Sequence, residues 1–122
     1  MTTSYQTLTD IAFAWGIRCF GSKHMSNKYI RALRTAEEVI ELCQACEVDG
    51  MQLHRLIDYV YAKEPGKIAQ EIGGVLVTSA VFCSTMGLEP DFVLATEVRR
   101  VLEKSPEYFA ERNRLKEQAG FD

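Results

Sequence analysis

Residues 69–83 read AQEIGGVLVTSAVFC, and this stretch decides between an all-α and a mixed fold. Apart from Gln70, Glu71 and two hydroxyls, its side chains are apolar or small. Its three valines favour a buried strand. The length favours a helix, because about twenty residues separate Pro65-Gly66 from Gly87 without a turn signal, and one strand is rarely that long. We therefore predict a helix over residues 67–86.

The remainder of the chain shows helical periodicity and offers no partner strand. Apolar residues recur at helical spacing from Tyr5 to Cys19, and Gly21 ends that helix. The polar segment GSKHMSN that follows predicts a loop. Capping residues, prolines and apolar spacing predict the other helices. These cover about 27–47, a shorter segment from Asp49-Gly50 to Pro65-Gly66, 90–102, and 105 to near Gly120. The expected fold is an all-α bundle of four to six helices.

Composition narrows the class of protein. The chain has 122 residues, of which 47% are hydrophobic and 25% charged, so we expect one globular domain over residues 1–122. A net charge of −3 argues against a nucleic-acid partner. The longest apolar stretch, Val75–Met86, is shorter than the ~20 residues of a membrane span, and no secretory signal is visible. We expect a cytoplasmic protein without a membrane partner.

The four cysteines are expected to be reduced thiols. Cys43 and Cys46 form a CxxC motif, but it lies deep inside a helical pattern rather than at the start of a helix after a strand. Packing in the core is the favoured interpretation. A redox role is the alternative, and it would require a thiol of lowered pKa at one of the two positions.

Carboxylates on two predicted helices suggest a metal site. Glu38 and Glu41 lie one turn apart and project from one helical face, which by itself is typical of a solvated acidic surface. Glu71 lies in a helix that its apolar residues would place in the core, where a carboxylate needs a partner or a metal. The adjacent Gly73 and Gly74 should cost about 2 kcal/mol of helix stability, which favours a close approach there by another helix or by a nucleotide.

Antiparallel packing of these two helices would bring Glu38, Glu41 and Glu71 together. Three carboxylates facing water suit Mg²⁺ or Mn²⁺, which are hard ions that prefer oxygen ligands. The expected cofactor is therefore Mg²⁺, with Mn²⁺ as a possible substitute.

The stretch RALRTAEEVIELCQA, residues 31–45, resembles the first metal-binding helix of the MazG-like, all-α nucleoside triphosphate pyrophosphohydrolases. The family signature is ExxE, a spacer and ExxD. Here ExxE is Glu38 to Glu41, and the second half aligns on Glu71 in EIGG, followed by an apolar run. The resemblance covers about Arg31 to Met86 and implies a MazG-like helical bundle. It also implies that these three glutamates bind the metal.

The chain departs from the family pattern at Gly74, where the family has an aspartate ligand. This Gly-Gly pair resembles a subfamily pattern. Either a water or another acid takes the place of the aspartate, or catalysis is weakened or lost. Glu97 is the candidate replacement, because it flanks the apolar stripe of the helix predicted over residues 90–102. A surface role for Glu97 is the alternative.

The resemblance implies Mg²⁺-dependent cleavage of a nucleoside triphosphate between its α and β phosphates, giving the monophosphate and pyrophosphate. An acid near the ligands activates the water in this family, and either Glu37 or Glu41 could serve. Positively charged side chains should hold the phosphates, although each also suits a solvated surface. The candidates are Arg34, Arg100, Lys104, Arg112 and Lys116.

Two functions remain open at this stage. One is an active pyrophosphohydrolase that clears or balances nucleotides. The other is a non-catalytic protein of the same fold that binds a nucleotide or a protein partner. An oligomer is expected for both, because small helical proteins with wide apolar faces often bury those faces between subunits. The family resemblance implies a homodimer or homotetramer, and the sequence itself gives no number of subunits.

Overall fold

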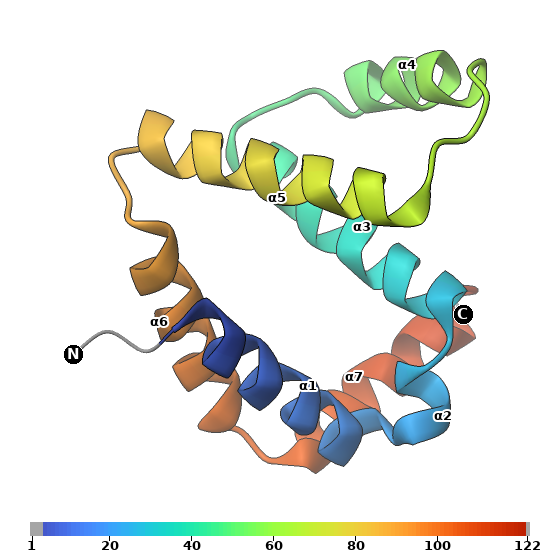
Figure 1. The fold of residues 1–122 in the computed structure, drawn as a ribbon. Coiled ribbons are helices and arrows are strands. Elements are labelled where there is room, and N and C mark those ends of the chain that lie inside the picture. Colours follow the sequence, from blue (N-terminus) through green and yellow to red (C-terminus); the bar gives the residue numbers. More distant parts are fainter. Residues whose placement is uncertain (1–3, 122) are drawn as a thin grey trace. The chain divides into compact units, whose positions relative to one another are not determined.

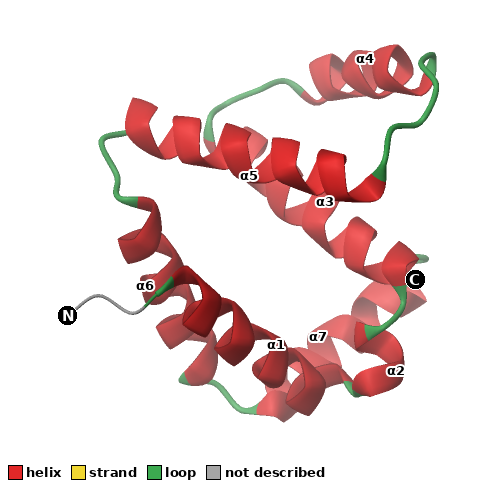
Figure 2. Ribbon diagram, in the orientation of Figure 1, coloured by secondary structure: helices red, strands yellow, loops and turns green. Residues whose placement is uncertain are grey.

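The computed structural model describes residues 4–121, and this part of the chain is all-α, without a strand (Figure 1, Figure 2). The all-α prediction is confirmed. Seven helices occur in the described range, one more than the upper end of the expected number. They are α1 (Tyr5–Phe20), α2 (Ser22–Met25), α3 (Lys28–Ala45), α4 (Gly50–Tyr61), α5 (Ile68–Thr85), α6 (Pro90–Leu102) and α7 (Pro106–Gln118).

Local chemistry sets the helix ends largely where the sequence placed them. The backbone N–H of Thr7 donates to Ser4 at the start of α1, and Gly21, with a φ of 84°, ends that helix. Asp49 accepts from the Met51 N–H at 3.2 Å and caps α4. Pro90 and Pro106 occupy the first turns of α6 and α7, where a missing N–H costs nothing. Ser105 caps α7 through the Tyr108 N–H.

The additional helix is α2, which lies in the segment expected to be a loop. Ser22–Met25 forms the single turn α2, so the loop prediction is wrong for those residues. The side chain of Asn27 then accepts from the N–H groups of Tyr29 at 3.0 Å and Ile30 at 3.2 Å, which caps α3. A helical turn, followed by the Asn27 cap of α3, thus replaces the loop that the polar composition suggested.

The described chain divides into two compact units, and each is described separately. One contains residues 4–33 and 83–121, and the other contains residues 34–82. In the first unit, α1 packs against α2, α6 and α7. Leu8, Cys19 and Val98 form its buried apolar core, with 4–7% of each residue exposed. The expectation of a single domain over residues 1–122 stays a prediction.

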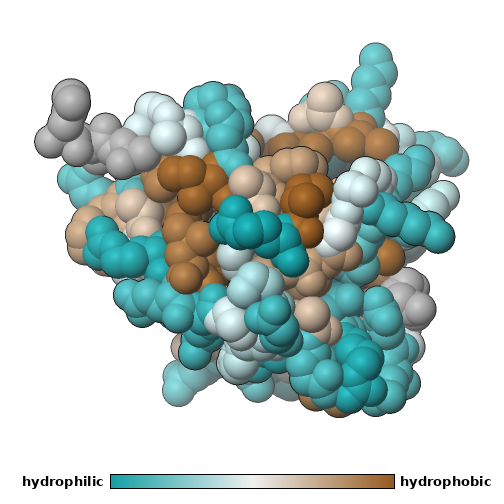
Figure 3. All heavy atoms as spheres, turned by 90° about the horizontal axis from the view of Figure 1, so that it is seen from below, coloured by the Kyte–Doolittle hydropathy of each residue, from teal (hydrophilic) through white to brown (hydrophobic). Residues whose placement is uncertain are grey.

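The second unit has no buried residue within 34–82. Helices α3, α4 and α5 leave most of their large apolar side chains exposed, such as Ile72 at 56% and Val77 at 65%. The expectation that α5 lies in a core is therefore wrong for the single chain. Apolar side chains also remain visible between polar ones on the face drawn in Figure 3. By length and composition alone α5 could cross a membrane, a property that core helices of soluble proteins share.

Candidate functional site

The acidic residues of α3 share one stretch of helix, as predicted. Glu37, Glu38 and Glu41 lie in its second half, beyond the first turn that Asn27 caps. Glu38 and Glu41 are exposed, and Glu37 is half-buried. The ExxE pair therefore projects from a single helical face where an ion could reach it.

Glu71 lies in the first turn of α5, and it is exposed rather than buried. Its side chain folds back over Gly66, so closely that a methyl group on residue 66 would overlap the carboxylate. This position brings the negative charge to the positive end of the α5 dipole, which favours an anion. Burial therefore does not force a metal onto Glu71 in the single chain, because this residue is exposed.

The two glycines that follow Glu71 have open surroundings. A Cβ built on Gly73 or on Gly74 would meet no described atom within 4 Å outside its own helix. The close approach expected from the cost of two helical glycines is therefore not made by the described residues of this chain. Gly74 also has room for a side chain, so the missing aspartate of the family pattern is not excluded by crowding.

The donor chemistry suits a hard divalent cation, but a single chain does not gather the donors. Carboxylate oxygens on α3 and α5 are ligands of the type that Mg²⁺ and Mn²⁺ prefer. Among residues 4–121, however, no three His, Cys, Asp or Glu side chains lie close enough together to hold a metal ion. Glu38, Glu41 and Glu71 thus belong to one unit without forming a three-ligand cluster in it.

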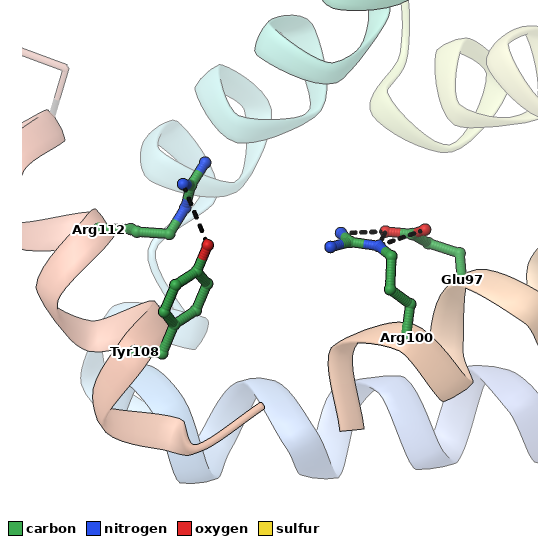
Figure 4. A network of polar contacts seen from close by, with 4 residues as sticks. All are labelled: Glu97, Arg100, Tyr108 and Arg112. Carbon is green, nitrogen blue, oxygen red and sulfur yellow. Dashed lines mark hydrogen bonds and ion pairs between the residues drawn. The ribbon is translucent and has the colours of Figure 1, made fainter. Parts of the chain in front are cut away.

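Glu97, the candidate replacement ligand, is engaged by a cation of its own helix. Arg100 donates from Nε and Nη2 to both carboxylate oxygens of Glu97, at 2.6–3.0 Å (Figure 4). These hydrogen bonds are the main reason that the pKa of the Glu97 carboxyl lies below its ordinary value. Partial burial opposes that shift, and the charge of Arg100 adds to it. A metal at Glu97 would have to compete with the guanidinium.

The predicted phosphate-binding cations divide between the two units. Arg34 is half-buried on α3, close in sequence to the ExxE pair, and belongs to the unit that contains the acids. The other four predicted phosphate-binding side chains lie in the other unit. Around its Tyr108, Lys104 lies with Nζ 4.7 Å from the ring centroid and Arg112 with its guanidinium carbon 5.6 Å from it. Arg112 also donates to the tyrosine hydroxyl at 3.5 Å, as Figure 4 shows. Arg100 on α6 and Lys116 on α7 complete the set.

One polar cluster was not predicted from the sequence. His24, in α2, lies against Phe20 with ring centroids 5.2 Å apart. A hydrogen bond of 2.9 Å joins its Nδ1 to Nη2 of Arg31, whose guanidinium lies over the same phenyl ring. Because the guanidinium can only donate, Nδ1 accepts in this arrangement. The separation of seven residues across a helix start has no recognisable sequence signal.

The thiols give no redox motif of the expected geometry. All four cysteines are free, with Cys19 buried, Cys43 half-buried and Cys46 exposed. Cys43 lies in the last turns of α3 and Cys46 just beyond its end, so neither opens a helix. Burial is the main cause that raises the pKa of the Cys19 thiol. The expected core packing of the CxxC pair is not found at Cys46 in the single chain.

Comparison of the chain with protein-family models, with curated proteins and with solved structures finds no match.

Proposed function

We propose that this protein is a Mg²⁺-dependent nucleoside triphosphate pyrophosphohydrolase that releases the nucleoside monophosphate and pyrophosphate. The observation that carries the proposal is that one unit contains accessible acidic side chains on two of its helices. Glu38 and Glu41 lie one turn apart on α3, and Glu71 lies in the first turn of α5. Their spacing resembles the MazG-like signature, and their carboxylates are exposed.

The residues of the proposed site have separate roles. Glu38, Glu41 and Glu71 would hold the ion once α3 and α5 bring them together. Bound Mg²⁺ would supply charge neutralisation at the triphosphate oxygens and an acidified water. Glu37 or Glu41 would accept the proton of the attacking water, for which half-buried Glu37 has the more shielded position. Arg34, on the same helix, would bind a phosphate oxygen.

Measurement of pyrophosphate release tests this function. The full-length protein is incubated with a panel of nucleoside triphosphates and Mg²⁺ or Mn²⁺. We expect turnover with at least one nucleotide, and a loss of at least about 100-fold in Glu38→Gln and in Glu71→Gln. Glu64→Gln is the matched control, because Glu64 is another exposed acid of the same unit outside the motif. Equal loss in all three variants would argue against the motif.

The second candidate function is a non-catalytic helical protein that binds a nucleotide or a protein partner. It is favoured by Gly74, which offers no ligand where the family pattern has an aspartate, and by the lack of a three-ligand cluster within residues 4–121. Calorimetric titration with Mn²⁺ and with nucleotide separates the two. Nucleotide binding without pyrophosphate release, in the presence of metal, would support this second function.

A further inference from the structure

Two contacts of different chemistry hold α2, which connects α1 to α3 (Figure 1). Toward α1, the side chain of Met25 covers Gly16 so closely that a methyl group on residue 16 would overlap it. Toward α3, a hydrogen bond of 2.9 Å joins Nδ1 of His24 to Nη2 of Arg31. The first contact contains no titratable group. The second contains an imidazole, whose charge ordinarily changes between about pH 5 and 8.

The hydrogen bond between His24 and Arg31 requires a neutral imidazole. A guanidinium has five N–H donors and no acceptor, so the ring nitrogen that faces it has to accept. A neutral ring has one accepting nitrogen, whichever way the ring is turned, whereas a protonated ring has none. Protonation of His24 therefore removes this hydrogen bond and brings two cations face to face.

Phe20, the last residue of α1, lies against both partners of this bond. The centroid of its ring is 5.2 Å from that of His24 and 5.6 Å from the guanidinium carbon of Arg31. Both partners are half-buried. Because water screens charges less at a half-buried site than on an open surface, repulsion between a charged imidazole and the guanidinium would be felt there.

The sequence around α2 is rich in cations. Residues 11–36 contain no Asp or Glu. The part of this stretch that lies in the unit of α2 contains four cations, which are Arg18, Lys23, Lys28 and Arg31. Helix α7, which packs against α1, carries Glu107, whose charge acts on Cys19, and it also carries Arg112 and Lys116. A protonated His24 would be a fifth positive charge in this stretch.

We propose that His24 and Arg31 form a pH-sensitive latch between α2 and the first turns of α3, closed while His24 is neutral and opened by its protonation. Opening frees the start of α3 from α2. Helix α2 itself stays on α1 through Met25, and its turn keeps its own hydrogen bonds, such as that from the Ser26 N–H to the Ser22 carbonyl at 3.0 Å. The junction between the two helices then absorbs the movement.

Titration of the imidazole signals by proton NMR tests the latch, because the chain has only two histidines. In Arg31→Gln a neutral amide replaces the guanidinium. We expect His24 to titrate about one pH unit higher in this variant than in the wild type. His54, which is exposed on α4 in the other unit, is the internal reference, and its midpoint should be the same in both proteins. An unchanged midpoint of His24 would overturn the proposal.

Urea denaturation at several pH values gives an independent measurement. The latch needs a neutral His24 in the folded protein, so the unfolded chain binds more protons, and the urea midpoint should fall as the pH drops through the histidine range. His24→Asn keeps an acceptor oxygen close to the position of Nδ1 and has no ring to protonate. Its urea midpoint should therefore depend less on pH in this range. His54→Asn is the matched control and should keep the wild-type dependence.

The remaining outcomes also decide the question. An equal pH dependence in the wild type and in His24→Asn would overturn the proposal, as would a loss of that dependence in His54→Asn. If Arg31→Gln fails to fold, the comparison of the wild type with His24→Asn decides by urea denaturation and by fluorescence. Trp15 is the only tryptophan of the chain, and its ring lies 5.8 Å from that of Phe20, so its emission reports on this cluster. We expect a pH-dependent change of emission in the wild type that His24→Asn lacks.

Discussion

The carboxylate of Glu71 lies over the Cα of Gly66, at the N-terminal end of α5, where a methyl group would displace it. The substitution Gly66→Ala should therefore have two opposing effects on the free energy of unfolding. Replacing a glycine whose conformation alanine can adopt stabilises by about 0.4–1 kcal/mol. Moving a carboxylate away from a helix N-terminus costs about 0.3–1 kcal/mol. The two nearly cancel, so we expect little change in the free energy of unfolding.

A double-mutant cycle exposes this cancellation. In the background of Glu71→Ala no carboxylate has to move, so Gly66→Ala should stabilise by the full ~0.4–1 kcal/mol. Urea denaturation at one fixed protein concentration measures both backgrounds. Equal effects of Gly66→Ala in the two backgrounds would show that Glu71 does not occupy this position in solution.

Gly74→Asp should strengthen metal binding. The new carboxylate would lie three residues after Glu71 on the same side of α5, and its Cβ meets no described atom within 4 Å. We expect Mn²⁺ to bind about tenfold more tightly or better, since even outer groups of metal sites change affinity by that factor. Electron paramagnetic resonance of free Mn²⁺ gives the affinity. Gly73→Asp places the same acid away from Glu71 and serves as the control, so an equal gain in both variants would contradict the prediction.

The ion pair of Glu97 with Arg100 should give a small stabilisation that depends on pH. Because Arg100 lowers the pKa of Glu97 below its ordinary 4.5 in the folded protein, the stabilisation is present above that value. It is lost as the pH falls through the lower, folded-state pKa. Both side chains are more than half exposed, so the coupling at neutral pH should be only about 0.2–1 kcal/mol. A cycle of Glu97→Gln and Arg100→Gln, measured at pH 7 and at a series of lower pH values, checks this; a coupling that stayed constant after the carboxyl had been protonated would contradict it.

Asn27→Ala should destabilise the start of α3. The Asn27 side chain accepts from the N–H groups of Tyr29 and Ile30, and loss of such a cap costs about 1 kcal/mol. Asn27→Asp keeps an acceptor at this position and should retain most of the stability. Thermal unfolding followed by circular dichroism compares the three proteins. The prediction fails if alanine and aspartate lower the Tm equally.

The sequence determined the positions of most helix ends, because a cap depends only on residues that are close together along the chain. Ser4, Gly21, Asp49 and Pro90 lie at the helix ends where their capping or backbone preferences place them. The turn α2 was missed because a polar composition does not distinguish a loop from a single helical turn. The end of α4 was also predicted too late, at Pro65-Gly66, whereas the helix ends at Tyr61. The positions of Glu38 and Glu41 on one exposed face of α3 could likewise be assigned from spacing alone.

Only the tertiary structure decided what is buried. The apolar run of α5 predicted a core helix, yet the single chain leaves Ile72 and Val77 exposed and Glu71 solvated. The spacing of apolar residues indicates which face of a helix is removed from water, but it does not indicate which surface covers that face. Whether carboxylates on separate helices meet depends on that same packing, which involves distant segments or a second chain. Whether Glu38, Glu41 and Glu71 converge therefore could not be read from their spacing in the sequence.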